Sequence, residues 1–302
     1  SFEAVLSETS MITTEINYAL ANLKTWMKDE HVDKNLATTL DTAYIRKDPF
    51  GVVLIIGPWN YPLNLVLIPL VGAISAGNCA IVKPSEISTA TEKIVSDLLP
   101  RYLDQECFAV VCGGPKETTQ LLENKFDYIF FTGSPNVGKI IMTAAAGKLT
   151  PVTLELGGKN PCYIDDRCDL KTTANRVIWS RFFNAGQTCI AVDYVLCTKE
   201  MRDKLVPVMK ETLEEFYGKD PQKSPDYGRI INDRHFQRVK ALMGSGTVVI
   251  GGETDEQDKY IAPTGLVDVK DSDPVMQEEI FGPVLPFRTV KDIDEAIAFI
   301  NQ

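Results

Sequence analysis

Val52-Val53-Leu54-Ile55-Ile56-Gly57 opens a stretch in which short apolar runs alternate with helix-like segments. Continuous apolar runs are typical of strands buried on both faces, and their alternation with helices indicates right-handed βαβ units. We therefore expect residues 51–157 to form a doubly wound, Rossmann-like parallel sheet of the α/β class. The runs are Val52–Gly57, Cys79–Val82, Phe108–Cys112, Tyr128–Phe131 and Val152–Leu156.

Three further features place helices within and before this stretch. The apolar segment Leu63–Ala76 is interrupted by polar and helix-breaking residues and is too short to span a bilayer, so a buried helix is expected. Thr89-x-x-Glu92 has the spacing of a capping box and predicts a helix start. Residues 1–30 have apolar positions at helical spacing, and residues 36–50 read as an extended connecting or oligomerisation segment.

The remainder of the chain predicts a second α/β unit. We expect a dinucleotide-binding domain at residues 1–156 and a catalytic domain at 157–302 that is incomplete at its C-terminal end. The expected strands and helices of this second domain are Cys162–Ile164, Leu170–Phe183, Tyr194–Cys197, Met201–Phe216, Val248–Gly252, Val284–Phe287 and a final amphipathic helix from Ile293.

Composition and charge exclude several classes of function. The 302 residues carry a formal charge of −10, whereas nucleic-acid binding usually requires a basic face. Seven cysteines without a CxxC pair and only two histidines argue against a zinc site, so no metal is expected. Reduced thiols in the cytoplasm are the simplest interpretation.

The turn Gly133-Ser134-Pro135-Asn136-Val137-Gly138-Lys139 follows a predicted strand and opens a helix. Glycines permit a tight turn, and the helix start presents N–H groups that suit phosphate oxygens. The segment matches part of a P-loop, but Ile140 stands where a magnesium-binding Ser or Thr belongs, and the GxGxxG fingerprint is absent. A simple βα turn without any ligand is the alternative.

Cys189 is the candidate nucleophile. It follows Asn184-Ala185-Gly186-Gln187-Thr188, a polar and turn-compatible approach, whereas a reactive thiol needs access to substrate and dipoles that favour thiolate. A buried structural cysteine is the competing interpretation. It suits the cysteines that lie in or beside apolar strands, namely Cys79, Cys107, Cys112, Cys162 and Cys197.

Other polar side chains stand where parallel strands end, the usual place for ligands in such folds. Glu155 interrupts an apolar strand, and a carboxylate buried there is costly without a purpose, although a salt bridge is the alternative. Asn60 can donate to an oxyanion, and Lys83 with Glu86 stands where ribose recognition occurs. Taken singly, each of these residues is a weak signal.

Together these segments resemble the aldehyde dehydrogenase superfamily, in that family's order. Phrases such as Ala43–Lys47, Asn160–Asp165 and Tyr260–Thr264 are similar to its class-3 branch, the B-type members in particular. The motifs that carry the resemblance are Pro58-Trp59-Asn60-Tyr61-Pro62, Lys83-Pro84-Ser85-Glu86, Phe131-Thr132-Gly133-Ser134, Leu154-Glu155-Leu156-Gly157-Gly158-Lys159, Gly186-Gln187-Thr188-Cys189 and Glu278-Glu279-Ile280-Phe281-Gly282-Pro283.

The resemblance implies NAD(P)-dependent oxidation of medium-chain, long-chain or aromatic aldehydes to carboxylic acids. Cys189 would be the nucleophile, Asn60 the oxyanion donor and Glu155 the base that hydrolyses the thioester. NAD and NADP are the implied cofactors. Their contacts would come from Trp59, Lys83, Glu86, Gly133, Ser134, Val137, Gly138, Glu279 and Phe281.

The chain departs from the family pattern at Val192, where proline is expected, and at Gly265, where an aliphatic residue is usual. Both ends also look cut. A non-catalytic fragment or binding protein that keeps the fold is therefore the alternative function. The resemblance further implies a homodimer in the full-length protein, a cytoplasmic location, and membrane contact only through segments outside these 302 residues.

Overall fold

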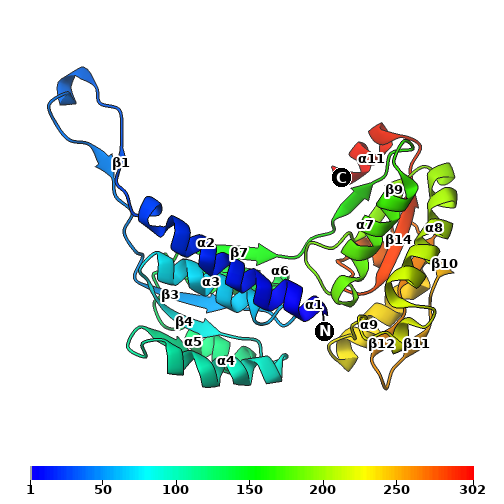
Figure 1. Cartoon of the computed structure of the whole chain (residues 1–302), viewed down its shortest axis with the longest axis horizontal. Helices are drawn as coiled ribbons and strands as arrows, with labels where there is room; N and C mark the ends of the chain where they lie inside the picture. Colours follow the sequence, from blue (N-terminus) through cyan, green and yellow to red (C-terminus); the bar gives the residue numbers. More distant parts are fainter. Residues whose placement is uncertain (1) are drawn as a thin grey trace. The chain divides into compact units, whose positions relative to one another are not determined.

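The computed structural model describes residues 2–302, which divide into two compact units. The N-terminal unit is Ala4–Leu156, and the C-terminal unit is Gly157–Gln302 together with the start of the chain up to Glu3. Each unit has its own five-stranded sheet with helices packed against it (Figure 1). The expected α/β fold is confirmed. The assignment of cofactor binding to residues 1–156 and of catalysis to residues 157–302 stays a prediction.

The N-terminal unit contains the expected parallel sheet, in the order β5-β4-β3-β6-β7. The chain moves outward from β3 to β5 and then returns to the other side of β3, which creates a topological switch point between β3 and β6. The strands are β3 (Val52–Ile56), β4 (Cys79–Lys83), β5 (Phe108–Val110), β6 (Tyr128–Gly133) and β7 (Val152–Leu156), and the helices are α3 (Asn64–Ser75), α4 (Thr89–Tyr102), α5 (Pro115–Leu121) and α6 (Pro135–Ala146).

The two faces of the central strand explain why its sequence is apolar throughout. Val53 and Ile55 pack into one buried cluster with α3, whereas Leu54 and Ile56 pack into a second cluster with α6. Successive side chains of a strand point to opposite faces, so a strand covered by helices on both faces needs apolar residues at every position.

Helix α4 begins at Thr89, which confirms the expected helix start. The capping box itself does not form, because Ser88 provides no side-chain cap and Glu92 accepts instead from the Gly113 N–H at 3.2 Å. The expected burial of Glu155 is wrong. Glu155 is exposed rather than buried. The reason is topological, since β7 lies at the edge of the sheet and pairs only with β6.

The first part of the chain is helical and then extended. Helix α1 (Phe2–Ala4), a π-helical segment η1 (Val5–Ser10) and α2 (Met11–Trp26) confirm the expected helix, which ends four residues earlier than residue 30. A two-stranded ribbon of β1 (Glu30–His31) and β2 (Tyr44–Ile45) follows, with a short 3₁₀ helix η2 (Leu36–Thr38) between them. This arm extends away from the sheet of its own unit (Figure 1).

The C-terminal unit has a mixed sheet in the order β10-β13-β14-β9-β8, in which only β10 runs antiparallel to its neighbour. Its elements are β8 (Pro161–Tyr163), α7 (Leu170–Phe182), η3 (Phe183–Gly186), β9 (Tyr194–Cys197), α8 (Lys199–Tyr217), η4 (Pro221–Lys223), α9 (Asp233–Leu242), η5 (Met243–Ser245), β10 (Thr247–Ile250), β11 (Thr254–Asp255), β12 (Tyr260–Ile261), β13 (Thr264–Val267), α10 (Pro274–Gln277), β14 (Val284–Thr289) and α11 (Ile293–Ile300).

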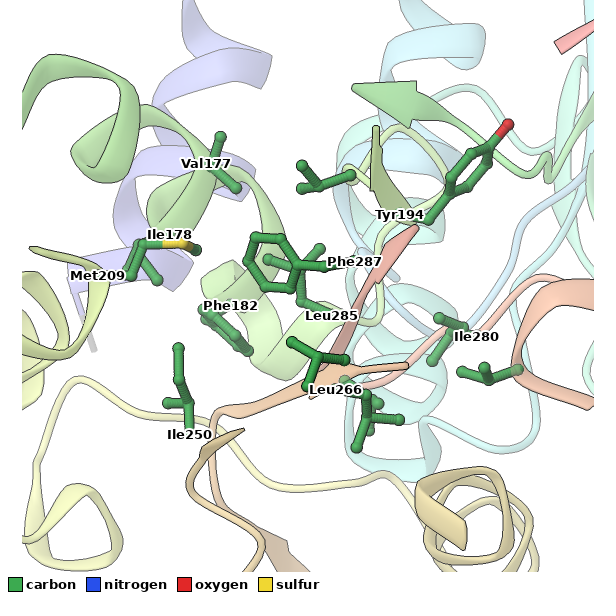
Figure 2. Packing of buried hydrophobic residues seen from close by; sticks show 14 of the residues in the cluster. Val177, Ile178, Phe182, Tyr194, Met209, Ile250, Leu266, Ile280, Leu285 and Phe287 are labelled. Atoms are coloured by element: carbon green, nitrogen blue, oxygen red, sulfur yellow. The ribbon is translucent and has the colours of Figure 1, made fainter. Parts of the chain in front are cut away.

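One continuous apolar core supports this second sheet. Figure 2 shows Ile178 and Phe182 of α7 beside Leu285 and Phe287 of β14, with Met209 of α8 next to them. Burial of such a cluster is the main stabilising contribution to the unit. No helix within residues 2–302 has both the length and the apolar character needed to cross a lipid bilayer.

Candidate active site

The turn from β6 into α6 is built to expose a helix start. Ser134 caps α6 by accepting from the Val137 N–H at 3.4 Å, and Pro135 occupies the first helical turn without an N–H to satisfy. A Cβ on Gly138 would approach Leu156 to 2.8 Å, so this glycine serves close packing of α6 on β7. The remaining amides at this helix end suit a phosphate group.

The end of β4 holds Lys83 and Glu86. The Lys83 ammonium is buried and donates to the carbonyl oxygens of Pro84 at 2.9 Å and Gly113 at 2.8 Å, with Glu86 at 3.5 Å. It therefore ties the end of β4 to the segment after β5. The Glu86 side chain is about 39% exposed and lies near Gly114, which leaves its carboxylate available to a ribose hydroxyl.

The loop after β3 carries Trp59 and Asn60, both half-buried, and leads into α3. Glu8 of η1 holds this helix start, because its carboxylate accepts from the N–H groups of Leu63 and Asn64, each at 2.8 Å. Burial raises the pKa of Glu8, and the two amide donors oppose that rise. Sequence reasoning missed Glu8, since nothing local connects it with a loop some 50 positions later.

Cys189 follows an unusual backbone turn in the C-terminal unit. Asn184, Ala185 and Gly186 all have positive φ, at 54°, 51° and 73°, which for non-glycine residues stores strain. A Cβ on Gly186 would collide with the carbonyl of Gly282, so only glycine permits this contact. The turn before the half-buried Cys189 therefore rests directly on the backbone of the loop that contains Glu279 and Phe281.

Side chains on both sides of Cys189 fix its backbone. Gln187 is buried, donates to the carbonyls of Asn184 and Arg229 at 3.1 and 3.0 Å, and accepts from the Ile231 N–H. Asn160 donates to the carbonyl of Cys189 at 2.7 Å and to that of Ala191 at 3.0 Å. Sequence reasoning missed this role of Asn160, because its partners lie about 30 positions later in the chain.

Glu279 lies between α10 and β14, and its carboxyl group contacts Gly157 and Gly158 at the start of the C-terminal unit. Its Oε1 accepts from the Gly158 N–H at 3.4 Å, and a Cβ on Gly157 would collide with the same carboxyl group. Burial raises the pKa of Glu279, while the Gly158 amide opposes the rise. Phe281, two residues later, has φ at 48°.

A buried ion cluster joins these loops. Arg181 is buried and donates to Asp193 at 3.1 Å, to the carbonyl of Val192 at 3.0 Å and to that of Gly282. Asp193 also accepts from Lys159 at 2.5 Å and from the Ile280 N–H at 3.1 Å. Burial lowers the pKa of Lys159, and the nearby Asp193 carboxylate opposes that change. One carboxylate thus holds three segments in place.

The departure at Val192 is accommodated locally. Its N–H, which proline would lack, donates to Ser180 Oγ at 3.3 Å. At Gly265, a Cβ would approach Ile250 to 3.1 Å, so the small residue matches a close strand pair. Cys112, expected to be buried, is exposed because it lies beyond the end of β5, whereas Cys197 within β9 is buried as expected.

Across residues 2–302, no group of three or more His, Cys, Asp or Glu side chains is arranged to hold a metal ion. The family model for the aldehyde dehydrogenase family matches residues 2–302 of the chain. The chain belongs to the aldehyde dehydrogenase family.

Relatives within this family lie in its family 3, which confirms the class-3 resemblance. Aldehyde dehydrogenase family 3 member B1 of Homo sapiens is 66% identical over 302 residues, covering 100% of this chain and 64% of the relative. Member B3 of Mus musculus is 65% identical over 301 residues, covering 100% and 63%. The chain thus spans a little under two thirds of these aldehyde dehydrogenases.

Solved structures of aldehyde dehydrogenases share the fold. The Staphylococcus aureus enzyme AldH in a substrate-bound state superposes with a TM-score of 0.97 at 46% identity, covering 99% of this chain and 66% of that one. A Mycobacterium tuberculosis aldehyde dehydrogenase complexed with NAD+ superposes with a TM-score of 0.83 at 28% identity, covering 97% and 62%. The roles of individual site residues stay predictions.

Proposed function

We propose that the chain carries the NAD(P)-dependent oxidation of aldehydes to carboxylic acids, with Cys189 as the nucleophile. The observation that carries this proposal is the turn Asn184–Gly186, whose three positive φ angles lead to a cysteine held by Gln187 on one side and Asn160 on the other. Strained backbone of this kind persists where surrounding structure over-determines it, as functional sites do. The human relative's name and the family model support the same activity.

The residues offer a group for each step. The Cys189 thiolate attacks the aldehyde carbon to form a thiohemiacetal, whose oxyanion accepts hydrogen bonds from the Asn60 amide and the Cys189 N–H. The nicotinamide cofactor, when bound, supplies the two-electron oxidation that turns this adduct into a thioester. Glu155, exposed at the end of β7, then takes a proton from the water that hydrolyses the thioester.

The residues fit a dinucleotide. The capped start of α6 suits the diphosphate, and Gly133 would place its backbone close to it. Two carboxylates suit the ribose hydroxyls: Glu86 beside Gly114, and Glu279 beside Gly158. We propose both NAD and NADP as cofactors. The Mycobacterium tuberculosis structure contains NAD+, and another family member of 28% identity contains NADP.

For substrate and assembly we propose a medium-chain, long-chain or aromatic aldehyde and a cytoplasmic homodimer. The relatives in family 3 support the substrate class. The arm between β1 and β2 supports self-association, because Leu36 and Leu40 on it are almost fully exposed. Exposed leucines on an extended arm are costly in water unless another surface covers them.

The absorbance of reduced nicotinamide tests the activity directly. The chain is mixed with NAD or NADP and a panel of aliphatic and aromatic aldehydes, and we expect reduced cofactor to accumulate with the long aliphatic or aromatic members. Cys189→Ala should reduce turnover by at least about 10³-fold while NAD still protects the protein against heat. Cys168→Ala, at an exposed cysteine outside the site, is the matched control and should keep full turnover.

Undiminished turnover in Cys189→Ala would show that a residue other than Cys189 is the nucleophile. Cofactor binding without turnover for every aldehyde would instead identify the chain as a binding protein that keeps the fold.

A further inference from the structure

Two cysteines of the N-terminal unit lie opposite each other at the start of neighbouring strands. Cys79 is the first residue of β4, and Cys107 immediately precedes β5. The strands are parallel with Ala80 opposite Phe108, and the Ala80 N–H donates to the Cys107 carbonyl at 3.0 Å. One position earlier in the same register, Cys79 therefore faces Cys107.

This register satisfies the geometry of a disulfide. Neighbouring strands lie about 4.8 Å apart, and the Cα atoms of a disulfide are usually about 4.4–6.8 Å apart. Opposite residues of registered parallel strands also point to the same face of the sheet. Both side chains are half-buried, so a small molecule can reach them from solvent.

We propose that Cys79 and Cys107 form a dithiol site that a hydroperoxide converts into an intramolecular disulfide. This site is distinct from the machinery assigned to Cys189, and it does not depend on the proposed activity.

The surroundings favour Cys79 as the first sulfur to be oxidised. The hydrogen bond with Cys79 raises the pKa of the Cys107 thiol, and burial and the carboxylates of Asp104 and Glu106 raise it further. We therefore assign Cys107 as the resolving thiol. Cys197 differs, because burial is the largest cause that raises its pKa to about 12.

The oxidation balances with hydroperoxide as the only co-reactant. The Cys79 sulfur attacks the peroxide, the O–O bond breaks, and an alcohol or water leaves while Cys79 becomes a sulfenic acid. The Cys107 sulfur then attacks the oxidised sulfur, an S–S bond forms, and the hydroxyl group leaves as water with the Cys107 proton. The two thiols lose two electrons and two protons, and the peroxide is reduced.

The fold accepts this bond without a change of register. The far ends of the same strands are already joined, because Lys83 donates to the Gly113 carbonyl at 2.8 Å. The new bond would close the segment 79–107, which contains α4, at the opposite end of these two strands. Cross-links that close such a loop restrict the unfolded chain, so oxidation should raise the midpoint of thermal unfolding.

Peptide mapping of the whole chain tests the site. The protein is treated with hydrogen peroxide, alkylated in denaturant and digested without reductant. We expect a linked peptide pair containing Cys79 and Cys107, an intact mass lower by two hydrogen atoms, and recovery of both thiols after dithiothreitol. Cys107→Ser should abolish the link and the rise in thermal midpoint, whereas Cys168→Ser should preserve both.

Two outcomes would overturn the proposal. One is a chain in which Cys79 and Cys107 both remain alkylated while Cys168 is oxidised under the same treatment. The other is a Cys79 that proceeds to sulfinic acid, or links to a different cysteine, without a bond to Cys107. Both outcomes are read from the wild-type chain, so neither depends on the folding of a variant.

Discussion

Glu3 lies against the turn that precedes Cys189 and carries a strongly shifted pKa. Its carboxylate accepts from the Asn184 N–H at 3.0 Å. Burial raises the pKa of Glu3 to about 7. The hydrogen bond from Asn184 opposes this rise, and the nearby Asp226 adds to it. The folded chain therefore binds the Glu3 proton more tightly than the unfolded chain does.

As a consequence, the free energy of unfolding decreases as the pH rises. Below the unfolded pKa of 4.5 both states are protonated. The decrease develops from there until the pH has risen through the folded pKa of about 7, because over this interval only the folded chain keeps the proton. Glu3→Gln keeps an acceptor for the Asn184 N–H and removes the titration. We expect urea midpoints of the wild type to fall between pH 5 and 8, in the range where this carboxyl ionises, and those of Glu3→Gln to fall less. Parallel pH profiles would show that Glu3 ionises normally.

At the scale of elements, the loops of the C-terminal unit depend on Asp193. Asp193→Asn leaves the buried Arg181 without a counter-charge, and removal of one partner from a buried pair costs about 3–5 kcal/mol. We expect the free energy of unfolding in urea to fall by about that amount. Asp203→Asn is the matched control, because its ion pair with Lys199 lies in solvent. Equal midpoints for the two variants would mean that the buried cluster contributes no stability.

Gly186 is the second structural requirement of the same loops. Gly186→Ala adds a Cβ at φ of 73°, directed at the Gly282 carbonyl, and neither backbone segment can rotate away as a side chain would. We expect a loss of about 2–4 kcal/mol from backbone strain and overpacking together. Gly244→Ala meets no atom within 4 Å and should be close to neutral. If calorimetry finds both variants equally stable, the turn can relax.

The strands of the N-terminal unit's sheet were predictable because each is marked by a short, continuous apolar run in the sequence. A strand covered on both faces is apolar throughout, as Val53 to Ile56 are. The edge strand β7 gave a misleading signal, since its apolar run predicted burial of Glu155 and the edge leaves that side chain exposed. Strand β13 was missed because it contains Gly265, and glycine is not typical of strands. The structure explains this glycine, since position 265 packs closely on Ile250.

The connections of the candidate site could not be predicted in the same way. The motif residues Cys189 and Glu279 were identified from the sequence, because family motifs are local. Their supports are not local: Glu8 reaches Leu63, Glu3 reaches Asn184, and Arg181 reaches Gly282. Such contacts join positions 55 to 181 residues apart, and tertiary packing alone brings them together.

At the scale of the whole molecule, we propose that Cys189 and Glu155 serve successive steps of one reaction. Glu155→Gln separates these steps, because a neutral amide cannot take the proton from water. Attack by Cys189 and the first oxidation do not need that base.

The decisive measurement is rapid mixing of Glu155→Gln with an aldehyde and NAD, followed by intact mass. We expect a burst of one equivalent of reduced cofactor, a very slow subsequent phase, and a mass increase of one acyl group located on Cys189. A slower burst would mean that Glu155 also helps to deprotonate the thiol. Normal steady-state turnover with no acyl group trapped on Cys189 would contradict the account and remove Glu155 from the mechanism.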